Sequence, residues 1–349
     1  MSTWLWHGYW NMISMVTRND RGIRLKSLNI LKSRLYTHTP LVLTHNVTYL
    51  CNCKCKTCDL WKKSSQFRDD LSRESVFRLL DEARDAGMVA YVAWGGEPLM
   101  RKDLPQILAH AKKNGLYTTV ITNGFLLPAR CEEIAPHTDL LIVSIDSDDE
   151  LHDEMRDLPG IRRKALEGIK RCKELKIRVM INSVISSLNL GKIDGLVTLA
   201  TDLGVPIAFE PLNVYPGYNE HLKPADDVIA AEFAKIVAHK RAGRDIVNSF
   251  QYLETIRQDY SRQKSYVCHA PEVFIEVHPD GTVARCTGGA WCNVKDIPLK
   301  QLFNGDDYRS FCKDARRCTK CVVSCVVESS LAYSLDPGFL IEKARYLWR

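Results

Sequence analysis

Three cysteines, Cys51, Cys55 and Cys58, have a spacing suited to an iron–sulfur cluster. Cys-x3-Cys-x2-Cys supplies three thiolates to a four-iron cluster and leaves the fourth iron without a protein ligand. Proteins that only transfer electrons normally bind every iron of a cluster through cysteine. An open iron allows a small molecule to chelate the cluster, so the motif predicts a site that performs chemistry.

Two other uses of closely spaced cysteines stay open. Structural zinc normally has four ligands, usually in two separated pairs. Disulfide frameworks are typical of small secreted chains, whereas this chain has 349 residues and 13 cysteines. The first basic residue is Arg18 and polar residues interrupt the opening apolar segment, so we expect no secretory signal peptide. So many free thiols favour a reducing cytoplasm.

A second motif, Gly95-Gly96-Glu97-Pro98, follows the next apolar run. Glycines allow a ligand to approach the backbone closely, and a carboxylate can bind an ammonium group. The same four residues also suit an ordinary turn. Their position, one strand and one helix after the cysteines, favours the binding function.

Short β-branched runs alternate with helical segments from Leu41 to Asn213, which is typical of a parallel sheet with helices outside. In such folds, function collects where strands end and loops begin. A helix capped by Ser72 and stopped at Gly87 is expected between the first two strands. The expected strands are Leu41 to Thr44, Val89 to Trp94, Tyr117 to Ile121, Leu140 to Ile145, Arg178 to Ile185 and Pro206 to Leu212.

Together these motifs resemble the radical S-adenosylmethionine (SAM) superfamily. The resemblance implies an α/β fold, a partial (β/α)6 TIM-like barrel, with a 4Fe–4S cluster on Cys51, Cys55 and Cys58. It also implies that SAM chelates the open iron and is cleaved reductively to a 5′-deoxyadenosyl radical, which abstracts a substrate hydrogen. The implied SAM-binding residues are Gly95, Gly96, Glu97, Pro98, Asn123, Ser144 and Arg156; no catalytic residue is assigned.

One position departs from the family pattern. The residue before the third cluster cysteine is usually aromatic and packs on adenine, but here it is Thr57. Trp61 or Trp94 could supply the missing contact.

A second group of cysteines follows residue 263. Cys268 and Cys286 flank a predicted β-hairpin with a turn at Asp280-Gly281, and Cys318, Cys321 and Cys325 lie further on. The group resembles the SPASM/twitch extension of radical SAM enzymes, a small Cys-rich α+β domain. The resemblance implies one auxiliary 4Fe–4S cluster on Cys268, Cys286, Cys318 and Cys321, with Cys325 as a rival ligand; a second auxiliary cluster is less expected, and zinc is the alternative.

The predicted organisation has five parts: an N-terminal amphipathic segment (1–40), the barrel (41–215), a helical connection (216–262), the SPASM/twitch domain (263–330) and a C-terminal amphipathic helix (331–349). Both ends combine aromatic and basic residues, as do helices at anionic membrane surfaces. They could equally dock on the barrel.

Three functions therefore stay open. The first is oxidation, or formation of a C–C or C–S bond, on a peptide or protein; the second is modification of a lipid or isoprenoid by a peripheral membrane enzyme. The third is a non-catalytic Fe–S or zinc scaffold. A flavodoxin or ferredoxin is the expected reductant. A net charge of +6 spread along the chain argues against nucleic acid.

Overall fold

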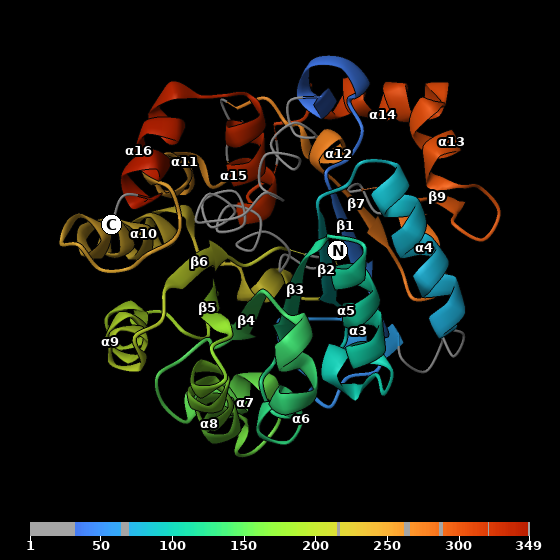
Figure 1. Cartoon of the computed structure of the whole chain (residues 1–349). Coiled ribbons are helices and arrows are strands. Elements are labelled where there is room, and N and C mark those ends of the chain that lie inside the picture. Colours follow the sequence, from blue (N-terminus) through green and yellow to red (C-terminus); the bar gives the residue numbers. More distant parts are fainter. Residues whose placement is uncertain are drawn as a thin grey trace.

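The computed structural model describes residues 32–63, 70–214, 217–261, 266–285, 289–319 and 321–347. Their central feature is a nine-stranded sheet in the order β6-β5-β4-β3-β2-β1-β7-β8-β9 (Figure 1). The predicted features of residues 1–31, and Cys286, lie outside the described residues. The strands are β1 (Val42–Asn46), β2 (Ala90–Trp94), β3 (Tyr117–Thr122), β4 (Leu140–Ser144), β5 (Arg178–Ile185), β6 (Ile207–Pro211), β7 (Phe274–Val277), β8 (Thr282–Ala284) and β9 (Ala290–Asn293).

The first six strands run parallel and in sequence order, as predicted. Helices lie outside them and leave the carboxyl ends of the strands to the loops. The α-helices are α3 (Leu60–Lys63), α4 (Arg73–Asp85), α5 (Leu104–Lys113), α6 (Leu127–Ile134), α7 (Leu151–Arg156), α8 (Ile161–Glu174), α9 (Ile193–Leu203), α10 (Asp226–Arg241), α11 (Phe250–Asp259), α12 (Ala270–Val273), α13 (Leu299–Asn304), α14 (Asp306–Ala315), α15 (Ser324–Tyr333) and α16 (Pro337–Leu347). The partial α/β barrel is thus confirmed.

Shorter helical turns are η1 (Ser33–Thr37, a π-helix), η2 (Pro98–Met100), η3 (Ala135–His137) and η4 (Glu220–Leu222). Of these, η2 begins at the proline of the Gly-Gly-Glu-Pro motif, because the fixed φ of proline suits the first helical position.

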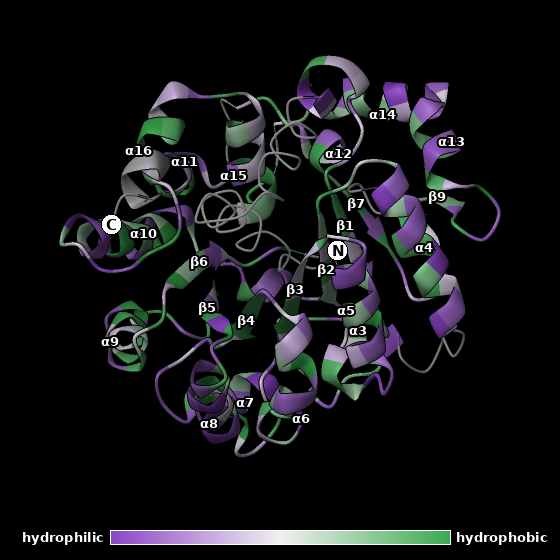
Figure 2. Cartoon of the chain, in the orientation of Figure 1, coloured by the Kyte–Doolittle hydropathy of each residue, from purple (hydrophilic) through white to green (hydrophobic). Residues whose placement is uncertain are grey.

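Local sequence explains why the barrel helices form where they do. Helix α4 begins after Ser72, whose hydroxyl accepts a hydrogen bond from the Ser75 amide. Its buried stripe consists of Val76, Leu79, Leu80 and Ala83. Cys131 and Cys172 are buried in α6 and α8, as expected of packing residues. Figure 2 shows hydrophobic colours on the inner strands and hydrophilic colours on outer helices such as α8.

The predicted hairpin forms β7 and β8, but it also joins the barrel sheet. Strand β7 pairs in parallel with β1, so that Thr44 lies opposite Glu276. The Thr44 hydroxyl donates to the Ile275 carbonyl at 2.6 Å. The Cys-rich part therefore continues the sheet beyond β1.

The remaining segments are helical. The predicted helical connection contains α10 and α11, and α15 runs across residue 330 before α16. No helix among the described residues is both long and apolar enough to cross a bilayer.

Candidate active site

An open pocket lies at the carboxyl ends of the barrel strands, and its empty space, with the solvent at its mouth included, is about 580 Å³. It gathers side chains and backbone from the cysteine loop, the glycine motif and the ends of β3, β4 and α7. The lining residues that the sequence predicts are Cys51, Cys55, Cys58, Gly95, Gly96, Asn123, Ser144 and Arg156. Residues about a hundred positions apart in the sequence thus line the same pocket.

The cysteine loop is held from two sides. On one side, the amides of Lys54 and Lys56 donate to the carbonyls of Arg156 and Met155, at 3.2 and 2.9 Å. These bonds join the loop to the end of α7.

On the other side, the Tyr218 hydroxyl donates to the Cys58 carbonyl at 2.8 Å and the Cys55 carbonyl at 3.2 Å. The Asn219 amide donates to the Thr57 carbonyl at 3.1 Å. Tyr218 and Asn219 carry no motif, so sequence reasoning missed them. They fix the loop through its backbone.

Replacing Tyr218 with phenylalanine should weaken this support. Each lost hydrogen bond costs about 0.5–1.5 kcal/mol, and the Cys55 and Cys58 carbonyls lose a shared donor. We expect a lower midpoint of thermal unfolding and faster loss of iron to a chelator. The matched control is Tyr260→Phe, because that hydroxyl donates at 3.4 Å to Leu212, away from the loop. Equal iron retention in both variants would contradict the role.

The thiols of the loop differ in their surroundings. Hydrogen bonds with Cys51 and Cys55, together with burial, raise the pKa of Cys53. Burial raises the pKa of Cys58 to about 12. The hydrogen bond with Cys53 lowers the pKa of Cys55, and the nearby Arg156 charge acts in the same direction. A thiolate ligand is thus favoured at Cys55.

The three motif cysteines line the space that an iron–sulfur cluster needs. In the part of the chain that the structure describes, no three Cys, His, Asp or Glu side chains are already gathered as they would be around a bound metal ion. The thiols face one cavity beside the buried Arg156 guanidinium. This donor set fits a cluster with three cysteine ligands.

The two glycines of the motif are required by packing within the chain. A Cβ on Gly95 would lie 2.2 Å from Asn46 Oδ1, and one on Gly96 would lie 2.2 Å from the Leu50 carbonyl oxygen. The Gly96 amide also donates to the Thr48 carbonyl at 2.8 Å. The glycines therefore let the segment that leads into Cys51 lie directly on the motif.

Glu97, the expected ammonium ligand, is bound by polar groups of the chain itself. It is fully buried, and its carboxylate accepts hydrogen bonds from Thr122 Oγ1 at 2.7 Å and from the amides of Asn123 and Leu99 at 2.8 and 3.0 Å. Burial raises its pKa. The carboxylate joins the ends of β2 and β3, and its contact with SAM stays a prediction.

Arg156 is fixed by a buried carboxylate. Its Nη2 and Nε atoms lie 2.7 and 3.1 Å from Asp146 Oδ2. Asp146 Oδ1 accepts from the Val184 amide at 3.0 Å. Burial alone would lower the pKa of Arg156, but the Asp146 charge raises it. Strands β4 and β5 thus orient a permanent positive charge toward the cavity.

Three aromatic or small side chains line the same cavity near the cysteines: Thr57, Trp61 and Trp94. Both tryptophans line the pocket, and their contact with adenine, in place of the family's aromatic residue, stays a prediction.

The second cysteine group surrounds Tyr266. Burial and the charges of Cys321, Cys268 and Cys318 raise the pKa of Tyr266, and its hydroxyl donates to the Cys321 carbonyl at 3.2 Å. Three of the predicted auxiliary ligands thus lie near one buried tyrosine, and their binding of a cluster stays a prediction. Burial raises the pKa of Tyr252, and the charges of Cys325 and Cys321 act in the same direction.

Cys312 belongs to a different cluster, because its thiol is hydrogen-bonded to Tyr308. That cluster lies around Glu272, at the opposite end of the barrel strands from the cavity.

Comparison with known proteins identifies the family. The profile of the radical SAM superfamily matches residues 45–198. The AdoMet-dependent heme synthase of Methanosarcina barkeri is 30% identical over 271 residues, which cover 75% of this chain and 76% of that protein. The chain belongs to the radical SAM superfamily. As in other members, a 4Fe–4S cluster and SAM are its cofactors.

Two further relatives of this radical SAM enzyme match parts of the chain. The Fe-coproporphyrin III synthase of M. barkeri is 33% identical over 179 residues, or 50% of this chain and 45% of that protein. The PqqA peptide cyclase of Granulibacter bethesdensis is 25% identical over 282 residues, or 76% and 74%. The chain thus spans under half of the first relative and about three quarters of the second.

A solved structure has the same fold. The crystal structure of Streptococcus suis SuiB bound to precursor peptide SuiA matches 84% of this chain and 72% of that chain, with 19% identity and a TM-score of 0.66. The predicted radical SAM barrel with a SPASM/twitch-type extension is confirmed.

Proposed function

We propose that this radical SAM enzyme abstracts a hydrogen atom from a peptide or protein and thereby oxidises it or forms a C–C or C–S bond in it. The observation that carries the proposal is the shared cavity of the three motif cysteines with Gly95, Gly96 and Arg156. When bound, the cluster and SAM supply the 5′-deoxyadenosyl radical that performs the abstraction.

The residues around the cavity have distinct roles in this proposal. Cys51, Cys55 and Cys58 hold the cluster. Arg156, oriented by Asp146, offers a positive charge to an anionic group of SAM, and the Ser144 hydroxyl and Asn123 amide contact its polar parts. The wall formed by Trp94, Ile121 and Ser144 is buried and would restrict water near the reacting atoms.

An auxiliary 4Fe–4S cluster would lie beside the barrel, on Cys268, Cys286, Cys318 and Cys321, with Cys325 as the rival ligand. The closeness of Cys268, Cys318 and Cys321 to Tyr266 supports three of these ligands. The auxiliary cluster would accept an electron from the substrate radical, which makes a net oxidation possible. A flavodoxin or ferredoxin would reduce the SAM-binding cluster.

The similarity to the PqqA peptide cyclase, which extends over 76% of this chain, supports a peptide substrate. A second candidate is a tetrapyrrole, because the AdoMet-dependent heme synthase is more similar to this chain, at 30% identity over nearly the same share. The lipid alternative depends largely on residues outside the described part of the chain.

The test is an anaerobic assay of reconstituted protein with dithionite as reductant. Wild type should bind about eight irons and form 5′-deoxyadenosine, whereas Cys55→Ala should lose about four irons and all product. Cys131→Ala, a buried thiol of α6, is the control and should behave as wild type. Zinc without iron, or a filled cluster without deoxyadenosine, would leave only the scaffold alternative.

Substrate class is tested in the same assay. A candidate peptide and Fe-coproporphyrin III, each deuterated, are supplied in turn. Transfer of deuterium into 5′-deoxyadenosine from the peptide supports the proposal, and transfer from the porphyrin alone supports the second candidate. Flotation of the full chain with anionic vesicles tests the lipid alternative, which absence of binding would contradict.

A further inference from the structure

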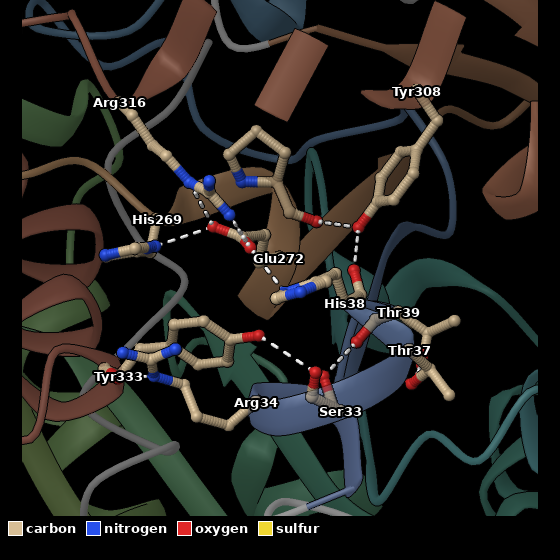
Figure 3. A network of polar contacts seen from close by, with 11 residues as sticks. Ser33, Arg34, Thr37, His38, Thr39, His269, Glu272, Tyr308, Arg316 and Tyr333 are labelled. Carbon is tan, nitrogen blue, oxygen red and sulfur yellow. Dashed lines mark hydrogen bonds and ion pairs between the residues drawn. The ribbon is translucent and has the colours of Figure 1, made fainter. Parts of the chain in front are cut away.

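A buried carboxylate, Glu272, is surrounded by three basic side chains (Figure 3). Its Oε2 lies 2.6 Å from His269 Nδ1, and its Oε1 lies 2.5 Å from Arg316 Nη2. His38 Nδ1 is 3.0 Å from Oε1. The Glu272 side chain is only 1% exposed, so these contacts replace its hydration.

The cluster is electrostatically stable. Burial alone would raise the pKa of Glu272, but the hydrogen bonds from His269 and Arg316 lower it to about 2. The carboxylate is therefore charged at any physiological pH. It acts as a permanent anchor between the segments that carry its partners.

Two of these partners lie on the segments that carry auxiliary cysteines. His269 directly follows Cys268, and Arg316 precedes Cys318 by two residues. Both segments also have bonds of their own near the cysteines: the His269 amide donates to Ser330 Oγ at 2.9 Å, and the Cys318 amide donates to the Ala315 carbonyl at 2.9 Å. The Glu272 side chain connects the two segments directly, and the Tyr266 hydroxyl, which donates to the Cys321 carbonyl, connects them a second time.

The third partner provides a contrast. His38 lies between η1 and β1, on a segment without cysteines. It is held there by other bonds, since its carbonyl accepts from the Tyr308 hydroxyl at 2.5 Å. Loss of the His38 side chain would remove one contact of Glu272 and leave the link between the cysteine segments intact.

We propose that Glu272 is a positioning residue for the auxiliary cluster: by pairing with both His269 and Arg316, it holds Cys268 and Cys318 at a common site before iron binds. The inference rests on the auxiliary cluster of the proposed function. Loss of a residue that orients metal ligands typically lowers metal affinity about 10–100-fold, and we expect an effect of this size when Glu272 is replaced.

The test isolates the auxiliary site. The full chain with Cys51→Ala, Cys55→Ala and Cys58→Ala should bind about four irons, with the Mössbauer spectrum of a 4Fe–4S cluster. Into this background we introduce Glu272→Gln, Arg316→Gln and His38→Gln separately. Iron per chain and the rate of iron loss to a chelator are measured anaerobically.

Glu272→Gln and Arg316→Gln should lose iron about 10–100-fold faster than the background, whereas His38→Gln should resemble it. Asp139→Asn is the matched control, because Asp139 pairs with Lys112 at 2.6 Å at the same end of the barrel, away from the cysteines. It should leave iron retention unchanged. If Glu272→Gln does not fold, Arg316→Gln alone tests the link between the two cysteine segments.

Each other outcome overturns the inference. Equal iron loss in the Arg316 and His38 variants would make Glu272 a general stabiliser of the fold. Unchanged retention in the Glu272 and Arg316 variants would show that the cysteines need no anchor. A background that binds zinc or no metal, while the unmodified chain still forms 5′-deoxyadenosine, would remove the auxiliary cluster and leave the SAM chemistry standing.

Discussion

Replacing Asp146 with asparagine should destabilise the protein by about 3–5 kcal/mol, because it removes the charge that neutralises a buried guanidinium. The Asp146 and Arg156 side chains are only 4% and 5% exposed and lie 2.7 Å apart. Asparagine keeps the size of the side chain, so the expected loss reflects charge and hydrogen bonding. Denaturant unfolding of the anaerobic protein measures the change.

The same substitution should affect SAM binding. Asp146 fixes the Arg156 side chain, and the Arg156 carbonyl accepts a hydrogen bond from the Lys54 amide. Arg156 is the last residue of α7, so a shift of this helix would displace the cysteine loop. We expect weaker SAM binding by equilibrium dialysis, with the auxiliary iron retained.

The control for Asp146→Asn is Glu132→Gln, which breaks an exposed ion pair with Arg171. Exposed pairs contribute little to stability, so this variant should unfold as wild type does. Equal losses in the free energy of unfolding for the two variants would show that the buried Asp146–Arg156 pair stabilises the protein no more than an exposed pair does.

The strands and barrel helices could be predicted because each carries a local signal. β-branched runs gave six strands within about two residues of their ends, and Ser72 marked the start of α4. The pairing of β7 with β1 could not be predicted. The two strands are more than two hundred residues apart in the sequence. No local sequence pattern predicts which edge of the sheet a later hairpin joins.

The site shows the same division. Cysteine spacing identified the loop that lines the cavity, since ligand spacing is a property of the sequence. Tyr218 and Asn219 act on backbone carbonyls of that loop, and such contacts leave no motif. Glu272 likewise resembles any acidic residue until folding brings His38, His269 and Arg316 around it.

Replacing Gly95 with alanine should have a comparably large effect, for two physical reasons. Gly95 has a φ of +139°, a conformation that costs a residue with a side chain about 1–3 kcal/mol. The new Cβ would also lie 2.2 Å from Asn46 Oδ1 and 2.6 Å from the Thr48 carbonyl oxygen. Such overpacking typically costs a further 1–3 kcal/mol or so.

The control is a glycine with a positive φ and no close neighbour. Gly115 also has a positive φ, +75°, but nothing lies within 4 Å of a Cβ placed on it. Gly115→Ala should therefore show only the backbone cost, about 1–2 kcal/mol. The difference between the two variants combines the close contact of the new Cβ with Asn46 and Thr48 and the larger backbone cost at the φ of Gly95.

The displacement should also reach the cluster. Thr48 precedes Cys51 by three residues, so a shift of its carbonyl moves the first thiolate relative to Cys55 and Cys58. We expect Gly95→Ala to lose about four irons per chain while the auxiliary site keeps its own, and Gly115→Ala to lose none. Full iron content with low stability in Gly95→Ala would show that the cysteine loop adapts independently of the glycine motif, and the packing contact would then serve only the fold.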